Sequence, residues 1–132
     1  MERKNKKTIL VVFEARSSLV SLNAFMNLSE NREYIIKIAR SDKDVVNIIQ
    51  AHSPDVILLD DAILEIEGEQ VISGILGFKN CPVILMTPYI SSDSVPRFME
   101  MGCYGCIRKV FETHSMNSII ARAIVQQGHP LR

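Results

Sequence analysis

The feature that most constrains the fold of this chain is the alternation of short apolar runs with stretches of helical periodicity. Such alternation is typical of βα units, in which a helix connects each strand to the next parallel strand. Several runs are almost wholly apolar, as expected for strands covered on both faces. Right-handed connections then predict an α/β fold, a doubly wound, five-stranded parallel sheet between two helical layers. The predicted strands are residues 8–12, 34–39, 55–59, 82–87 and 104–107.

Helical periodicity fills the intervals between these strands and follows the last of them. The last helix is the clearest, because apolar residues recur with a helical period from Met116 to Ile124, and the tail after Gln127 stops it. Gly77 is expected to end the third helix and Gly102 the fourth. The four earlier helices are marked by residues 19–26, 45–49, 71–76 and 95–99, and residues 41–44 form a cap for the second.

The size of the chain allows one compact domain. With 132 residues, of which 47% are hydrophobic, it can bury a sizeable core but is too short for two ordinary domains. We predict a basic N-terminal tail at residues 1–6, one domain at 7–127 and a short C-terminal tail at 128–132. No internal repeat interrupts this organisation.

Charge and hydropathy exclude several classes of partner. Lys plus Arg and Asp plus Glu number 15 each, so no net field favours direct binding to nucleic acid or to an anionic membrane. No apolar stretch approaches the roughly 20 residues that cross a bilayer, and residues 8–13 are too short for the apolar region of a signal peptide. We therefore expect a cytoplasmic protein that does not associate with membranes.

Polar side chains stand at the ends of four predicted strands. Glu14 follows the first strand, Asp60 closes the third, Thr87 closes the fourth and Lys109 follows the fifth. Ligand sites of parallel sheets gather outside the carboxyl ends of the strands, so these four side chains are expected to share one edge. An aspartate that merely ends a strand and caps a turn is the commoner case, and only the combination with the other three raises Asp60 above it.

In order and spacing, the chain resembles the receiver domain of two-component response regulators, which has a flavodoxin-like fold. The resemblance extends over about residues 7–127. It is carried by residues 9–12, by 54–60 with Gly68, by 82–87 and by 101–109. Together these segments are quite specific, although each alone would be weak.

The resemblance implies that Asp60 accepts a phosphoryl group from a histidine kinase or phosphotransfer protein. It implies that Glu14, Asp60 and the backbone carbonyl of Ala62 hold Mg²⁺, and that Thr87 and Lys109 contact the phosphoryl group. A metal ion there neutralises the charge that opposes attack by a carboxylate on an anionic group. The domain would be a signalling phosphoacceptor rather than an enzyme, with at most slow self-dephosphorylation. Its output would be altered binding to a downstream protein partner, and a homodimer is compatible with this.

Four positions depart from the family pattern. Phe13 stands where the family has a second acid, so Mg²⁺ binding is expected to be weak, by about 10- to 100-fold. Pro88 offers no backbone N–H to a phosphoryl oxygen. Val110 replaces a proline that often follows a cis bond, and we expect a trans bond here. Cys106 replaces a switching aromatic residue. The departures at Phe13, Pro88 and Val110 support an alternative hypothesis, a degenerate receiver that binds partners without phosphorylation.

A third hypothesis is thiol redox or zinc chemistry at Cys103 and Cys106, which form a C-x-x-C pair. The sequence contains no second such pair and no nearby pair of histidines to complete four metal ligands. Alternation along a strand predicts that the two thiols face opposite sides of the sheet. The interpretation we prefer is that both are small apolar residues filling core space.

Overall fold

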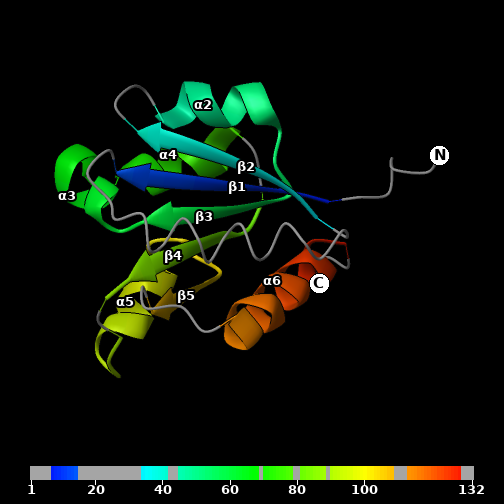
Figure 1. Ribbon diagram of the computed structural model, residues 1–132. Coiled ribbons are helices and arrows are strands. Elements are labelled where there is room, and N and C mark those ends of the chain that lie inside the picture. Colours follow the sequence, from blue (N-terminus) through cyan, green and yellow to red (C-terminus); the bar gives the residue numbers. More distant parts are fainter. Residues whose placement is uncertain are drawn as a thin grey trace.

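The fold is given by a computed structural model, shown in Figure 1. It describes residues 7–14, 34–41, 45–68, 70–78, 81–88, 90–108 and 113–128. The predicted helix at residues 19–26 and the cap at residues 42–44 lie outside this part of the chain.

Five strands form one parallel sheet, as the sequence predicts. The order of the strands across the sheet is β2-β1-β3-β4-β5, and every neighbouring pair is parallel. Each predicted strand lies within two residues of the observed one at both ends. The differences extend β1 through Glu14 and β3 through Asp60, so both acids belong to strands. The bounds are β1 Lys7–Glu14, β2 Tyr34–Ser41, β3 Val56–Asp60, β4 Val83–Thr87 and β5 Gly105–Arg108.

Four of the described helices fall where periodicity places them, and one does not. Helix α3 is unexpected, because its six residues are too few to display a helical period. Helix α4 contains Gly77 and ends at Phe78, so the prediction that Gly77 ends it was wrong; a glycine inside a helix costs only about 1 kcal/mol. The bounds are α2 Val45–His52, α3 Ala62–Glu67, α4 Gln70–Phe78, α5 Ser94–Glu100 and α6 Thr113–Gly128.

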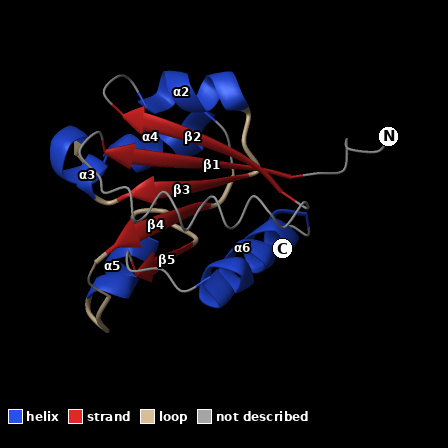
Figure 2. Cartoon of the chain, viewed as in Figure 1, coloured by secondary structure: helices blue, strands red, loops and turns tan. Residues whose placement is uncertain are grey.

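Helices cover both faces of the sheet, which makes three layers. Figure 2 shows α2 and α4 on one side of the sheet and α6 on the other. Alternate residues of each strand divide between two core clusters. Leu10, Leu59 and Leu85 pack with α2, α3, α4 and α5, whereas Val11 and Leu58 pack with α6. None of the helices in the described ranges is long and apolar enough to span a bilayer.

Gly102 ends α5, as predicted, and its geometry explains why. Its φ is +104°, a region that side chains disfavour, and an added Cβ would lie 2.7 Å from Cδ1 of Leu76. The N–H of Gly102 donates to the carbonyl of Met99, and the N–H of Cys103 donates to that of Phe98. This is the Schellman arrangement, which satisfies the last carbonyls of the helix before the chain enters β5.

Candidate functional site

Asp60 occupies the carboxyl end of β3, the central strand of the sheet. The side chain is 0% exposed. Its Oδ2 accepts a hydrogen bond from the backbone N–H of Glu14 at 3.1 Å, and its Oδ1 accepts one from the backbone N–H of Ala62, also at 3.1 Å. Hydrogen bonds from backbone N–H groups offset part of the cost of burying a carboxylate. The orientation of Asp60 is thus fixed from the end of β1 and from the start of α3.

Glu14 and Thr87 end the two strands that flank β3. Glu14 closes β1 and is 8% exposed, whereas Thr87 closes β4 and is 3% exposed. The hydrogen bond from the N–H of Glu14 joins the ends of β1 and β3, and Asp60 lies opposite Met86, the residue before Thr87, in the β3–β4 register. The structure therefore gathers an acid, a second acid and a hydroxyl at one edge. Lys109, the fourth predicted member, lies outside the described residues.

The donor set at this edge suits Mg²⁺. Two carboxylates, those of Glu14 and Asp60, together with a carbonyl oxygen are the hard oxygen ligands that this ion prefers, and it commonly uses one or two carboxylates with waters. Each oxygen of Asp60 accepts one described N–H bond, and because a carboxylate oxygen has two lone pairs, such a bond does not prevent the same oxygen from binding a metal. The described residues contain no cluster of three or more His, Cys, Asp or Glu side chains that could hold a metal ion.

Phe13 belongs to the core rather than to the site. Its side chain is 2% exposed and packs in the cluster beneath α6 with Val11, Met86 and Ile107. An apolar ring therefore stands beside Glu14 where a second acid would otherwise strengthen a metal site. Pro88 is exposed directly after β4. Val110 lies outside the described residues.

The turn between β3 and α3 is attached to the neighbouring strand end. The backbone N–H of Asp61 donates to the carbonyl of Met86 at 2.9 Å, and the N–H of Leu64 donates to the carbonyl of Asp61 at 3.0 Å. Asp61 is the N-cap residue of α3, and Ala62, the first helical residue, contributes the N–H that binds Asp60. A displacement of this turn would therefore also displace a donor to the Asp60 carboxylate.

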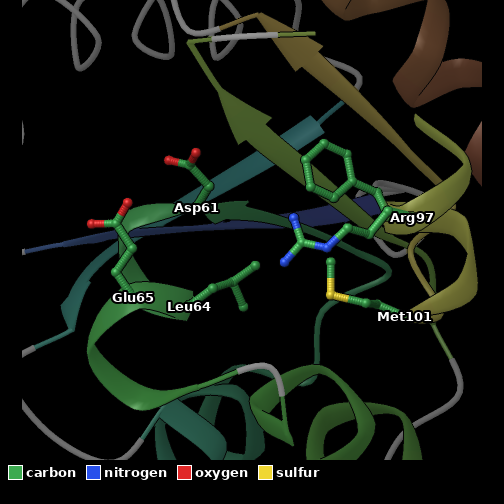
Figure 3. A pocket seen from close by; sticks show the side chains of 6 residues that line it. Asp61, Leu64, Glu65, Arg97 and Met101 are labelled. Atoms are coloured by element: carbon green, nitrogen blue, oxygen red, sulfur yellow. The ribbon is translucent and has the colours of Figure 1, made fainter. Parts of the chain in front are cut away.

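A pocket of about 240 Å³ lies beside this turn, between α3 and α5. Figure 3 shows Arg97 extending from α5 into it, toward Asp61 and Leu64 on the opposite wall. The sequence interpretation missed this site, although acids at positions 61 and 65 share one helical face by their spacing. Its lining comprises Asp61, Leu64, Glu65, Arg97, Phe98 and Met101.

The thiols do not have the arrangement that the sequence predicts. Cys103 is buried in the core on the α2–α5 side, and Cys106 packs against that same cluster. The prediction of opposite faces was wrong because β5 begins at Gly105, so Cys103 lies before the strand and its alternation does not apply. Burial, and secondarily the nearby Cys106, raise the pKa of the Cys103 thiol to about 12. Burial also raises the pKa of Cys106. Neither environment favours the reactive thiolate, which weakens the redox hypothesis.

Comparisons with known proteins agree on one family. A family model described as the response regulator receiver domain matches residues 9–121. The regulatory protein AtoC of Escherichia coli is 26% identical over 91 residues, which are 68% of this chain and 20% of AtoC, so the chain spans about a fifth of that relative. The polar-differentiation response regulator DivK of Brucella ovis is 24% identical over 106 residues, 78% of this chain and 84% of DivK. The signal receiver domain of a LuxO repressor protein from Vibrio parahaemolyticus has the same fold, with a TM-score of 0.77, 21% identity and coverage of 93% of each chain.

Proposed function

The chain belongs to the response regulator receiver domain family, and from this premise we propose that Asp60 accepts a phosphoryl group from a histidine kinase or phosphotransfer protein. Receiver domains are signalling phosphoacceptors of two-component systems rather than enzymes, and they interact with histidine kinases and downstream effectors. The proposal for this chain goes further, because it assigns the acceptor residue and the roles of its neighbours.

The observation that carries the proposal is the placement of Asp60. Its buried carboxylate ends the central strand and is oriented by the backbone N–H groups of Glu14 and Ala62. In the transfer, one carboxylate oxygen forms a bond to phosphorus while the P–N bond of the donor phosphohistidine breaks. The imidazole leaves with the electron pair of that bond. Positioning and charge stabilisation supply most of the catalysis in such reactions, and a carboxylate fixed at a strand end is already positioned.

Glu14 and Asp60 would hold Mg²⁺, with the backbone carbonyl of Ala62 as a further ligand. The ion would neutralise the repulsion between a carboxylate nucleophile and an anionic phosphoryl group. We expect the affinity to be low, because Phe13 supplies a buried ring instead of an outer acid.

Thr87 and Lys109 would contact the phosphoryl group after transfer. The hydroxyl of Thr87 can donate a hydrogen bond to a phosphoryl oxygen, and an ammonium group can pair with its charge. Pro88 has no N–H for the same purpose, which would remove a charge-assisted bond worth about 1.5 to 3 kcal/mol unless water replaces it. The phosphorylated state is therefore expected to be short-lived. The β4–α5 loop would respond to the new contact and alter the surface that a partner binds.

A direct test is the mass of the intact protein after incubation with acetyl phosphate and Mg²⁺. We expect one phosphoryl increment in the wild-type protein and none in Asp60→Asn. Asp55→Asn is a matched control, because Asp55 lies at the opposite end of the same strand segment and binds the N–H of Thr8 at 2.8 Å. An increment that persists in Asp60→Asn, or that never forms under donor excess, would refute the assignment.

A second candidate function has its own support. The buried Phe13 and the exposed Pro88 each remove an element of phosphoryl or metal binding. A degenerate receiver would keep the fold and bind its partner through it without phosphorylation. A partner whose affinity is the same for wild type and Asp60→Asn, with and without donor, would favour this function.

A further inference from the structure

One positively charged side chain that the proposed function does not use, that of Arg97, lines the pocket between α3 and α5. We propose that Arg97 assists phosphoryl transfer as a positioning residue: it acts through Asp61 and Glu65, whose negative charge beside Asp60 it compensates. The role in the reaction rests on the proposed function of Asp60.

The geometry places the charges of Arg97 and the two acids in one pocket. Arg97 extends from α5 with its guanidinium toward Asp61 and Leu64, and Glu65 stands on the same wall as Asp61 (Figure 3). Asp61 and Glu65 are four residues apart at the start of α3, so they lie on one helical face. Leu64, Phe98 and Met101 supply the apolar part of the pocket lining, and opposite charges that share the pocket attract each other. Arg97 itself is exposed, so this attraction is partly screened.

Asp61 is the link between this pocket and the phosphoacceptor. It directly follows Asp60, and its carboxylate adds negative charge beside the residue that must receive an anionic donor. A cation that faces Asp61 lowers the resulting repulsion. The turn also has a mechanical connection to the site, because the N–H of Asp61 binds the carbonyl of Met86 and the N–H of Ala62 binds Oδ1 of Asp60. Arg97 thus acts on Asp60 through the charge of Asp61, the residue that follows it.

The effect of Arg97 on the rate of Asp60 phosphorylation should therefore depend on the charge of the phosphodonor. Acetyl phosphate is mainly a dianion at neutral pH and phosphoramidate a monoanion. With either donor an oxygen of Asp60 forms the new P–O bond while the P–O or P–N bond of the donor breaks. Acetate, or ammonia that then takes a proton from water, leaves with the electron pair. Repulsion from an uncompensated Asp61 opposes the dianion more strongly, so loss of Arg97 should affect acetyl phosphate more.

The test compares initial rates of phosphorylation at low and high salt. We expect Arg97→Gln to slow the reaction with acetyl phosphate roughly two- to five-fold, the scale of an exposed charge pair, and to slow phosphoramidate less. The loss should shrink at high salt, because screening removes it. Arg97→Lys should restore most of the rate, and adding Asp61→Asn to Arg97→Gln should also restore it. Arg122→Gln is the matched control, since Arg122 is an exposed arginine on α6.

The outcomes separate this inference from the proposed function. If wild type is phosphorylated normally and Arg97→Gln has wild-type rates, the role of Arg97 is overturned while that of Asp60 stands. A slowing that is independent of salt and is not relieved by Asp61→Asn would overturn it as well. If wild type is not phosphorylated on Asp60, both fail. A double-mutant cycle of denaturation midpoints for Arg97→Gln and Asp61→Asn then reports whether the contact itself exists, since interacting residues give non-additive shifts.

Discussion

Replacing Phe13 by aspartate should lower the free energy of unfolding and raise the affinity for Mg²⁺. The ring is almost fully buried under α6 beside Val11, Met86 and Ile107. Truncating a buried Phe costs about 3 to 5 kcal/mol. A second acid beside Glu14 should raise Mg²⁺ affinity about 10- to 100-fold, and each tenfold gain is worth about 1.4 kcal/mol. The gain at saturating Mg²⁺ therefore offsets only part of the packing loss.

The assay is urea denaturation at several Mg²⁺ concentrations, with Phe13→Asn as the matched control. Both variants lose the same packing, but only Phe13→Asp adds a negative charge. Without Mg²⁺ both should be destabilised by several kcal/mol, and Phe13→Asp more so, because its carboxylate lies near those of Glu14 and Asp60. Binding to the folded state alone stabilises it by RT ln(1 + [Mg²⁺]/Kd), so the midpoint of Phe13→Asp should rise with Mg²⁺ far more than that of Phe13→Asn.

Two results would refute this reasoning. An equal response of the two variants to Mg²⁺ would mean that charge at position 13 does not reach the ion. Unchanged stability in both variants would mean that the Phe13 ring is not part of the core. If both variants are unfolded in buffer, the prediction is tested by refolding, because added Mg²⁺ should refold Phe13→Asp at concentrations that leave Phe13→Asn unfolded.

Three further perturbations test the fold around the site. Gly102→Ala should lower the free energy of unfolding by about 1 to 3 kcal/mol, because φ is +104° and the new Cβ meets Leu76, and Leu76→Ala should relieve part of this loss in a denaturant titration. Gly74→Ala should instead stabilise the domain by up to about 1 kcal/mol, because Gly74 lies inside α4 and the added Cβ would be in ordinary van der Waals contact, 3.8 Å from Cγ2 of Val46 on α2. A destabilised variant would contradict the packing of α2 on α4. The raised pKa of Cys103, about 12 against 9.0 for the free thiol, means that the unfolded state loses its proton first as the pH rises. The contribution of Cys103 to the free energy of unfolding should therefore be fully present below about pH 9 and be lost as the pH rises toward 12. Cys103→Ala should lack this part of the pH dependence.

The sheet could be predicted from sequence because its strands carry their signal locally. Residues 56–59 and 83–86 are continuously apolar, and strands β3 and β4 are buried at every position. The ends of the strands were harder to predict, because acidic residues are typical of loops. Glu14 nevertheless lies opposite Ser41 in the β1–β2 register, and Asp60 lies opposite Met86 in the β3–β4 register. Helix α3 escaped prediction because six residues offer less than two full turns of periodicity.

The site could be predicted only as far as topology determines it. Parallel strands bring their carboxyl ends to one edge, so Glu14, Asp60 and Thr87 could be grouped without coordinates. The two N–H groups that orient Asp60 could not be predicted, because their positions depend on the backbone conformation at the end of β1 and in the turn after β3. Arg97 was also missed, since nothing local in α5 indicates that it faces α3. The two thiols were wrongly predicted to face opposite sides of the sheet because the sequence did not show that β5 begins only at Gly105, after Cys103.

The two buried acids at the carboxyl ends of β1 and β3 support the proposed phosphoacceptor over the degenerate receiver. Glu14 and Asp60 are both buried, on adjacent strands, and the backbone N–H of one binds the carboxylate of the other. If both carboxylates were ionised and close together they would repel each other, and positive charge nearby would be needed to stabilise them. A domain that served only as an interaction surface would gain nothing from this arrangement and would be more stable with apolar residues there. In the proposed phosphoacceptor the two carboxylates would attract Mg²⁺, which would prepare Asp60 for an anionic donor. Because Phe13 adds no third carboxylate, the repulsion between carboxylates would be smaller than with three, and under this proposal a weakly bound ion would suffice to compensate it.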